Sequence, residues 1–437
     1  MKRRISAVVA ALGALALVAA CAPSSSTQQT PGQTSGGATD AVNTEPVTLT
    51  VWSWRTEDVD KYNRIFDVYE AAHEGVTINF EAFLNTEYNQ ILTTGLEGSD
   101  GPDVAQVRAY GQLQGWVEAG QLLALDDLVP DLQNIDPTVL AAAEGHKDGK
   151  HYSVPFATQT MTMFYNKAIF DDLGLTEPTT WDEFIALNEA IKASGIVPMA
   201  VGAKDSWVLP IVHDTLAATR YGGLDFEAAV LSGAKTFEDP DYIASIEVVK
   251  SVQSYMPDDV AGVAYADSQL LFTSGGAAQF PGGIYELATF QTQAPDMEIG
   301  IYQVPPTPDA KSATALTPAW GDGGYAVNAK SAKQAAAVEL IKWMATPEFG
   351  QLFADEIKQF SPIPGVTYDD PLMAEAWAGF QEHPSAYLLL VNFRYGEPMG
   401  TAVLGEEIQK IFLGSQDAAG AAAALQEGVS QWFTPNG

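Results

Sequence analysis

The feature that most constrains the fold is a regular succession of strand-like and helix-like segments near the start of the folded part of the chain. A run of β-branched and aromatic residues over 47–54 predicts a buried strand. Residues 58–73 then carry large apolar side chains at the i, i+3, i+4, i+7 spacing of an amphipathic helix. The succession continues with a strand over 76–83, a helix over 87–96 and a strand over 103–107. Strands that alternate with helices in this way pair in parallel, so the sequence predicts an α/β fold.

The same alternation continues along the rest of the chain. Thr180 and Glu183 form a capping box that predicts a helix, and Pro347 predicts the first turn of another. Ser331 predicts the cap of a helix that runs to Ala345. The other predicted elements are strands over 151–157, 160–165, 196–201 and 324–328 and a helix over 243–255. No short-period repeat is visible, which disfavours solenoids and propellers.

Size and composition narrow the class further. The chain has 437 residues, 46% of them hydrophobic, and a single core stops growing near about 250–300 residues, so we expect at least two domains. The net charge of −33 repels nucleic acid and anionic lipid headgroups. It also argues against an anionic substrate, unless a local basic pocket overrides it. One cysteine and five histidines disfavour metalloproteins and thiol enzymes, and we predict no cofactor and no metal.

The first 46 residues predict a signal peptide and a tether. Residues 1–20 combine a basic start with an apolar stretch that is short for a membrane span, which needs about 20 apolar residues. Cys21 follows at once, in a Leu–Val–Ala–Ala–Cys run that resembles a bacterial lipobox and predicts lipidation of this cysteine. The alternative is an ordinary secretory signal that happens to hold a cysteine. Residues 22–46 are rich in Ser, Thr, Gln, Gly and Pro, which predicts a flexible tether and a body held by lipid at the extracellular face of the bacterial membrane. Chemistry that depends on cytoplasmic ATP or NAD(P)H is excluded by that location.

Aromatic rings, guanidinium groups and amides recur where the predicted strands end. Ligands of open α/β sheets bind at the carboxyl ends of strands, so these residues are the candidate site. The mixture suits a sugar, whose C–H face stacks on aromatic rings and whose hydroxyls need bidentate polar partners. Core packing is the alternative for each aromatic residue, and we expect it for Trp52, Trp116, Trp181 and Trp343. The predicted ligand-binding residues are Trp54, Arg55, Asn85, Arg108, Tyr110, Gln159, Trp207, Tyr285, Glu286, Trp320, Asp322, Phe393 and Arg394.

Several stretches together resemble a known family. They are Val–Trp–Ser–Trp at 51–54, Gly–Pro–Asp–Val at 101–104, the segment 116–126, Pro–Phe–Ala at 155–157 with Phe–Tyr–Asn–Lys at 164–167, Pro–Thr–Thr–Trp–Asp–Glu–Phe at 178–184 and Gly–Tyr–Ala–Val–Asn at 324–328. In this order and spacing they resemble the extracellular solute-binding proteins of bacterial ABC importers. The likeness is to the sugar-binding branch, solute-binding protein family 1, which includes the maltose-binding proteins. It covers residues 47–437.

The resemblance implies a type II periplasmic-binding-protein fold. Each of its two lobes is a sheet flanked by helices, a hinge with several crossings joins them, and the ligand binds in the cleft between them. The first lobe would take residues 47–157 and 321–361, and the second lobe 158–320 and 362–437. One departure concerns the loop after Val107, which offers Arg108, Ala109 and Tyr110 where relatives commonly place an acidic residue.

The function implied is capture of a carbohydrate and its delivery to the permease subunits of an ABC importer by a monomeric protein. The spread of aromatic residues favours a neutral oligosaccharide of two to four units, with α-gluco- or α-galacto-linked sugars as candidates. The rival class is a surface-anchored glycosidase, which needs two carboxylates about 5–10 Å apart. With 55 acidic residues such a pair arises by chance, and no hydrolase, phosphate-binding or calcium-loop motif is present, so we predict a protein that is not an enzyme.

Overall fold

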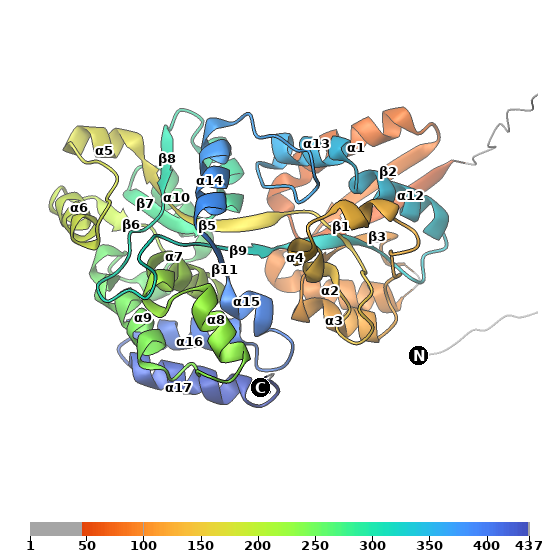
Figure 1. Cartoon of the computed structure of the whole chain (residues 1–437). Helices are drawn as coiled ribbons and strands as arrows, with labels where there is room; N and C mark the ends of the chain where they lie inside the picture. The colour runs from red at the N-terminus through yellow and green to blue at the C-terminus, as the bar shows by residue number, and fades with distance from the viewer. Residues whose placement is uncertain (1–45, 99, 436–437) are drawn as a thin grey trace, which may run out of the picture. The chain divides into compact units, whose positions relative to one another are not determined.

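Two β-sheets, each accompanied by helices, organise the protein (Figure 1). The computed structural model describes residues 46–98 and 100–435, which belong to one compact unit. The predicted signal peptide, Cys21 and the predicted tether up to residue 45 lie outside the described residues.

The first sheet has the strand order β2-β1-β3-β10-β4. Its strands are β1 (Val47–Ser53), β2 (Val76–Ala82), β3 (Val104–Arg108), β4 (Val154–Pro155) and β10 (Gly323–Val327). β1 pairs in parallel with β2 and β3, as the strand–helix succession predicts, whereas β10 runs antiparallel to β3 and β4. The carboxyl ends of the three parallel strands therefore meet at one edge, which receives Trp54, Asn85 and Arg108.

Amphipathic helices build the core of the first sheet. The main ones are α1 (Val59–Ala72), α2 (Asn85–Glu97), α3 (Gly111–Glu118), α12 (Gln334–Met344) and α13 (Pro347–Ile357), with the short α4 (Pro137–Leu140) between β3 and β4. α1 buries the apolar face that its sequence predicts. On that face Tyr62 stacks on Phe80 of β2, with the ring centroids 4.6 Å apart. Each fully buried side chain of this size stabilises the fold by about 1.5–3 kcal/mol.

The second sheet is built around one fully buried strand. β5 (Thr158–Asn166) pairs antiparallel with β7 (Ala277–Gly283), β8 (Ile299–Tyr302) and β9 (Thr317–Gly321). β6 (Val197–Met199) and β11 (Pro384–Ala386) add parallel edges beside β7 and β9. The parallel pairing suggested by strand–helix alternation thus holds only at the two edges of this sheet. Together the two sheets confirm the predicted α/β class.

The second sheet carries most of the helices, which are α5 (Lys167–Leu173), α6 (Trp181–Ala193), α7 (Leu209–Tyr221), α8 (Leu224–Leu231), α9 (Pro240–Ser251), α10 (Tyr265–Thr273), α11 (Leu287–Gln293), α14 (Pro371–Glu382), α15 (Leu388–Asn392), α16 (Gly400–Phe412) and α17 (Ala418–Val429). Every residue of α7 except Arg220 is buried, so this helix forms the centre of the second core. Within the described part of the chain, no helix combines the length and the apolar character needed to cross a bilayer.

Three connections carry the chain between the two sheets. They run from β4 to β5, from β9 to β10, and from α13 to residue 360, which pairs with Thr158. Gln159 touches all three, because its side-chain amide donates to Gln359 Oε1 (2.8 Å) and to Asp322 Oδ2 (3.2 Å). This arrangement fits a hinge with several crossings. The lobe boundaries given above remain a prediction.

Local signals located many element ends, with three exceptions, of which one is the helix predicted over 243–255, observed as α9 at Pro240–Ser251. The capping box at Thr180 and the Thr346 cap before Pro347 are both present. Ser331 does not cap α12, which begins at Gln334 with Lys333 as its N-cap. The Ser331 hydroxyl instead donates to Asp103 (2.6 Å). The strand predicted over 151–157 shortens to β4, because only Val154 and Pro155 pair with β10.

Candidate functional site

A cavity of about 700 Å³ lies among loops that follow strands of both sheets. Its lining mixes aromatic rings, guanidinium groups, carboxylates and amides. Nine of the thirteen residues predicted to bind a ligand line it: Trp54, Arg55, Asn85, Arg108, Trp207, Tyr285, Trp320, Asp322 and Arg394. The fold therefore gathers residues that lie up to 340 positions apart onto one surface. Their contact with a ligand stays a prediction.

Three other predicted residues are buried away from this lining. The Tyr110 hydroxyl accepts a hydrogen bond from the Gly321 backbone N–H (3.1 Å). Gln159 is fully buried in the connections between the sheets. Phe393 is also fully buried, and it packs edge-to-face on Phe237 with the ring centroids 4.9 Å apart. All three help to hold the walls of the cavity, and none of them presents a side chain to it.

Trp54 and Arg108 form a stacked pair on the first-sheet side. The guanidinium carbon of Arg108 lies 3.9 Å from the centroid of the Trp54 ring. Arg108 Nε donates to Asn89 Oδ1 (3.0 Å), and Nη2 donates to the side-chain oxygen of Asn85. Asn85 and Asn89 stand four residues apart on α2, so one helix face orients the guanidinium. Burial lowers the pKa of Arg108 to about 10.

Arg55 borders the same cavity, but nearby carboxylates compensate its charge. Its Nη2 lies 2.6 Å from Asp58 Oδ2 and its Nη1 lies 3.2 Å from Glu57 Oε1. Arg55 and Asp58 are both buried, and Lys61 adds a contact of 2.8 Å to Asp58. Arg55 therefore contributes more to the rigidity of this wall than to its net charge.

Aromatic rings dominate the second-sheet side. Trp207, which is half-buried, packs edge-to-face with Tyr265, with the ring centroids 4.8 Å apart. Tyr285, also half-buried, meets Trp320 edge-on at 6.4 Å, and Trp320 meets Tyr387 in the same way at 5.3 Å. Trp207 and Tyr285 thus keep part of each ring open to the cavity, whereas Trp320 is almost fully buried.

Glu286 lies behind this aromatic wall and acts through its neighbours. Its carboxylate accepts from the Tyr265 hydroxyl (2.7 Å) and from Gln269 Nε2 (2.7 Å), and both donors line the cavity. Burial raises the pKa of Glu286 to about 7. Direct ligand contact is predicted for Glu286 from the sequence; in the structure Glu286 does not line the cavity, and its carboxylate accepts from Tyr265 and Gln269.

Sequence reasoning missed several polar residues of the lining. Asn89, Gln269 and Gln293 each stand four residues after another lining residue on the same helix. For Asn89, the spacing from the predicted Asn85 was an available signal, whereas the helices that carry Gln269 and Gln293 were not predicted. Asp205 and Tyr387 had no comparable local signal.

The tryptophans predicted to be core residues fall into two groups. Trp116 and Trp343 are buried, as predicted. Trp52 is half-buried and donates from its indole nitrogen to Glu81 (2.8 Å). Trp181 is half-buried and packs on Phe184, with the ring centroids 5.0 Å apart. None of the four lines the cavity.

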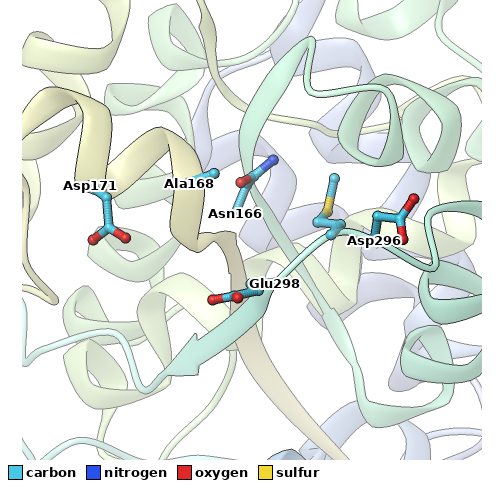
Figure 2. Close-up of a pocket in the computed structure, with 6 residues that line it drawn as sticks. Asn166, Ala168, Asp171, Asp296 and Glu298 are labelled. Carbon is cyan, nitrogen blue, oxygen red and sulfur yellow. The ribbon is translucent and has the colours of Figure 1, made fainter.

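A second cavity, of about 350 Å³, lies where α5 begins and β8 starts. Figure 2 shows the carboxylates of Asp171, Asp296 and Glu298 around it, together with Asn166 and Ala168. These carboxylates point in different directions in that view. Among residues 46–98 and 100–435, no group of three or more His, Cys, Asp or Glu side chains is placed to hold a metal ion.

The chain is similar to known proteins over most of its length. Residues 53–351 match the family described as bacterial extracellular solute-binding protein. The chain is 27% identical over 290 residues to the multiple sugar-binding protein of Streptococcus mutans. The aligned region covers 64% of this chain and 67% of that protein. It is 27% identical over 351 residues to the diacetylchitobiose binding protein DasA of Streptomyces coelicolor, with 78% of each chain covered. Some other relatives match over about half to two thirds of their own length.

Solved structures share the fold. The solute-binding protein RafE in complex with raffinose has a TM-score of 0.72 and 23% identity, with 88% of this chain and 99% of that chain covered.

Proposed function

We propose, from the premise that this chain belongs to the family of bacterial extracellular solute-binding proteins, that it captures a carbohydrate in the cavity between its two sheets. The observation that carries the proposal is the lining itself, which sets half-open aromatic rings opposite oriented guanidinium and amide groups. A sugar ring has an apolar C–H face that stacks on the aromatic rings, and its hydroxyls form hydrogen bonds with the guanidinium and amide groups.

An oligosaccharide of two to four units fits this cavity best. Its volume of about 700 Å³ lies within the usual range of about 300–1,000 Å³ for small-molecule sites. Trp207 and Tyr285 offer separate, partly open aromatic surfaces, and each would serve one sugar ring. Names of relatives that include sugar-binding and diacetylchitobiose-binding proteins support a carbohydrate. That the captured sugar is uncharged and carries α-gluco or α-galacto linkages remains a prediction from the sequence.

Delivery to the permease subunits of an ABC importer follows from family membership. We propose that the two predicted lobes close over the sugar and that the monomeric, closed form docks on the permease. Ligand binding shifts such an equilibrium only by its difference in affinity for the open and closed states. Small-angle scattering should therefore show a more compact particle with saturating ligand, and identical curves with and without ligand would argue against closure.

Binding without hydrolysis is the expected chemistry. Glu286 has the raised pKa of a general acid, but both of its oxygens accept hydrogen bonds from Tyr265 and Gln269, and it does not line the cavity. It is therefore poorly placed to protonate a glycosidic oxygen. Calorimetric titration of the purified protein with a panel of mono- and oligosaccharides tests the proposal. We expect binding of at least one oligosaccharide, recovered intact; release of shorter sugars would favour the glycosidase.

Anchoring through Cys21 is a separate proposal, because that residue lies outside the described structure. The change Cys21→Ser should move the protein from the membrane fraction into the medium without changing its affinity for sugar. Membrane retention of the variant would contradict lipidation at this position.

A further inference from the structure

Two arginines of this acidic protein lack a carboxylate partner. The chain has 55 acidic and 22 basic side chains, so a carboxylate is available for almost any exposed cation. Of the five arginines among the described residues, Arg55, Arg64 and Arg220 form ion pairs with carboxylates. Arg108 and Arg394 form none with any described residue, and both line the same cavity.

The fold holds these two arginines close together. Arg108 ends β3, and the loop after it leads to Gly111, which packs against the backbone of Arg394. A Cβ atom added at Gly111 would lie 2.0 Å from the Arg394 carbonyl oxygen, so only glycine permits this approach. The charge of Arg394 in turn helps to lower the pKa of Arg108, although burial is the larger cause.

Each guanidinium keeps unused donors. Arg108 donates hydrogen bonds from Nε to Asn89 and from Nη2 to Asn85. Its Nη1 donates no hydrogen bond to the described residues. Arg394 donates no side-chain hydrogen bond to the described residues, and its Nε is buried without a partner. A buried donor of this kind normally has a partner, so one is expected to arrive with a ligand.

Few carboxylates act on Arg108 and Arg394. Asp322 acts on both arginines, and it already accepts from Gln159 Nε2 (3.2 Å) and Trp320 Nε1 (3.4 Å). Glu397 also acts on Arg394, but it is exposed, where solvent screens its charge. Burial lowers the pKa of both arginines, which means that their charged forms lack full compensation. The half-buried Asp322 is therefore the one carboxylate that acts on both guanidinium groups.

We propose that one unit of the captured carbohydrate carries a carboxylate, as a uronic acid does, and that this carboxylate binds to Arg108 and Arg394. The inference rests on the proposed carbohydrate-binding function and revises only the charge of the ligand. A planar guanidinium matches a carboxylate through two parallel hydrogen bonds. The overall charge of −33, from which the sequence predicts a neutral sugar, acts mainly over distances that salt screens, so the nearby pair decides the preference of the cavity.

A pair of sugars that differ only at C6 tests this directly. α-1,4-Digalacturonate and α-1,4-galactobiose share ring stereochemistry and linkage, and cellobiuronic acid with cellobiose gives a second pair of another linkage. For at least one pair, titration calorimetry should show tighter binding of the carboxylate member by about tenfold or more. That preference should shrink between 0.05 and 0.5 M NaCl, because an ion pair is involved.

Variants locate the carboxylate in the cavity. Arg394→Gln and Arg108→Gln should each weaken binding of the carboxylate sugar by about thirtyfold or more, as expected when one partner of a buried charge pair is removed. Binding of the neutral sugar should weaken less, by about fivefold to tenfold, because only hydrogen bonds to hydroxyls are lost. Arg64→Gln is the matched control, because Arg64 is exposed and pairs with Glu356 outside the cavity, and it should change neither affinity. Melting temperatures confirm that each variant is folded.

The outcomes separate this inference from the function on which it rests. If the neutral sugar of each pair binds equally or more tightly and salt has no effect, the proposal that the ligand carries a carboxylate is wrong. Carbohydrate capture itself would then still stand. Tighter binding of galactose 1-phosphate than of digalacturonate also overturns the carboxylate, because the anionic group would then be a phosphate. Failure of every sugar, in these pairs and in the wider panel of mono- and oligosaccharides, overturns carbohydrate capture and this inference together.

Discussion

The two walls of the cavity are built in different ways. On the first-sheet side, polar groups fix one another: Arg55 is held by Asp58, and Arg108 is held by two asparagines of α2. On the second-sheet side, aromatic rings form the surface, and the buried carboxylate of Glu286 holds Tyr265 and Gln269 from behind. The comparison shows that the two walls offer different interactions, with directional hydrogen-bond donors on the first-sheet side and aromatic surfaces on the second-sheet side.

The division also predicts where stability and affinity separate. Groups on the first wall that pair with a buried charge should matter for folding, because an unpaired buried charge is costly. Rings on the second wall that remain partly open should matter for binding, because they give up little packing when removed. The following experiments test this difference.

The largest expected effect is on the stability of the first wall. Asp58→Ala leaves Arg55 buried without its closest partner, so we expect the free energy of unfolding to fall by about 3–5 kcal/mol in denaturant titration. Glu356→Ala removes the partner of the exposed Arg64 and should cost less than about 1 kcal/mol. Similar losses for the two variants would show that the Arg55–Asp58 pair does not hold the wall.

Glu286 should give the second wall a dependence on pH. Its pKa of about 7 in the folded protein lies above the value of about 4.3 in an unfolded chain. Between these values the folded state binds more protons than the unfolded state, so the free energy of unfolding falls as pH rises. The loss approaches roughly 3–4 kcal/mol above pH 7. Glu286→Gln lacks this titration, so the stability of the variant relative to the native protein should rise across that window.

Chemical denaturation of both proteins at pH 4.5, 6 and 8 measures the effect. Parallel stability curves for the two proteins would mean that Glu286 keeps an ordinary carboxyl pKa. A loss of sugar affinity in the variant without a pH-dependent stability difference would confine its role to orienting Tyr265 and Gln269.

The open rings of the second wall should contribute affinity more than stability. Trp207→Ala and Tyr285→Ala should each weaken sugar binding by about 2 kcal/mol, or roughly thirtyfold in Kd. Trp343→Ala is the contrasting variant, because its ring is buried outside the cavity and its loss should cost about 3–5 kcal/mol of stability with little change in affinity. A large drop in melting temperature with unchanged affinity would place Trp207 or Tyr285 in the core.

The smallest expected effect concerns the orientation of Arg108. Asn89→Ala removes the acceptor of its Nε but leaves Asn85 and the Trp54 ring in place. We expect sugar affinity to fall by about 1 kcal/mol, or roughly fivefold, with a nearly unchanged melting temperature. No change in affinity would indicate that Asn85 and Trp54 orient the guanidinium by themselves.

Local sequence patterns were sufficient for the elements that supply the first wall. The apolar spacing of residues 58–73 predicted α1, and the strand-like runs predicted β1, β2 and β3 within one or two residues. Placing residues after these strands was then enough to nominate Trp54, Asn85 and Arg108. The second wall was harder, because β7 and α10 were not predicted and Tyr265 and Gln269 were not nominated.

Order along the chain thus determined the class of fold, the candidate strand ends and the types of side chain at the site. Which of these side chains are buried, and which partners they contact, depends on segments that lie far apart in the sequence. Glu286 became a support because α10 covers it, Phe393 became a core residue because Phe237 packs on it, and Arg394 came close to Arg108 through Gly111. Hydrophobic periodicity is a property of neighbouring residues, whereas the environment of a charge depends on every element that packs around it.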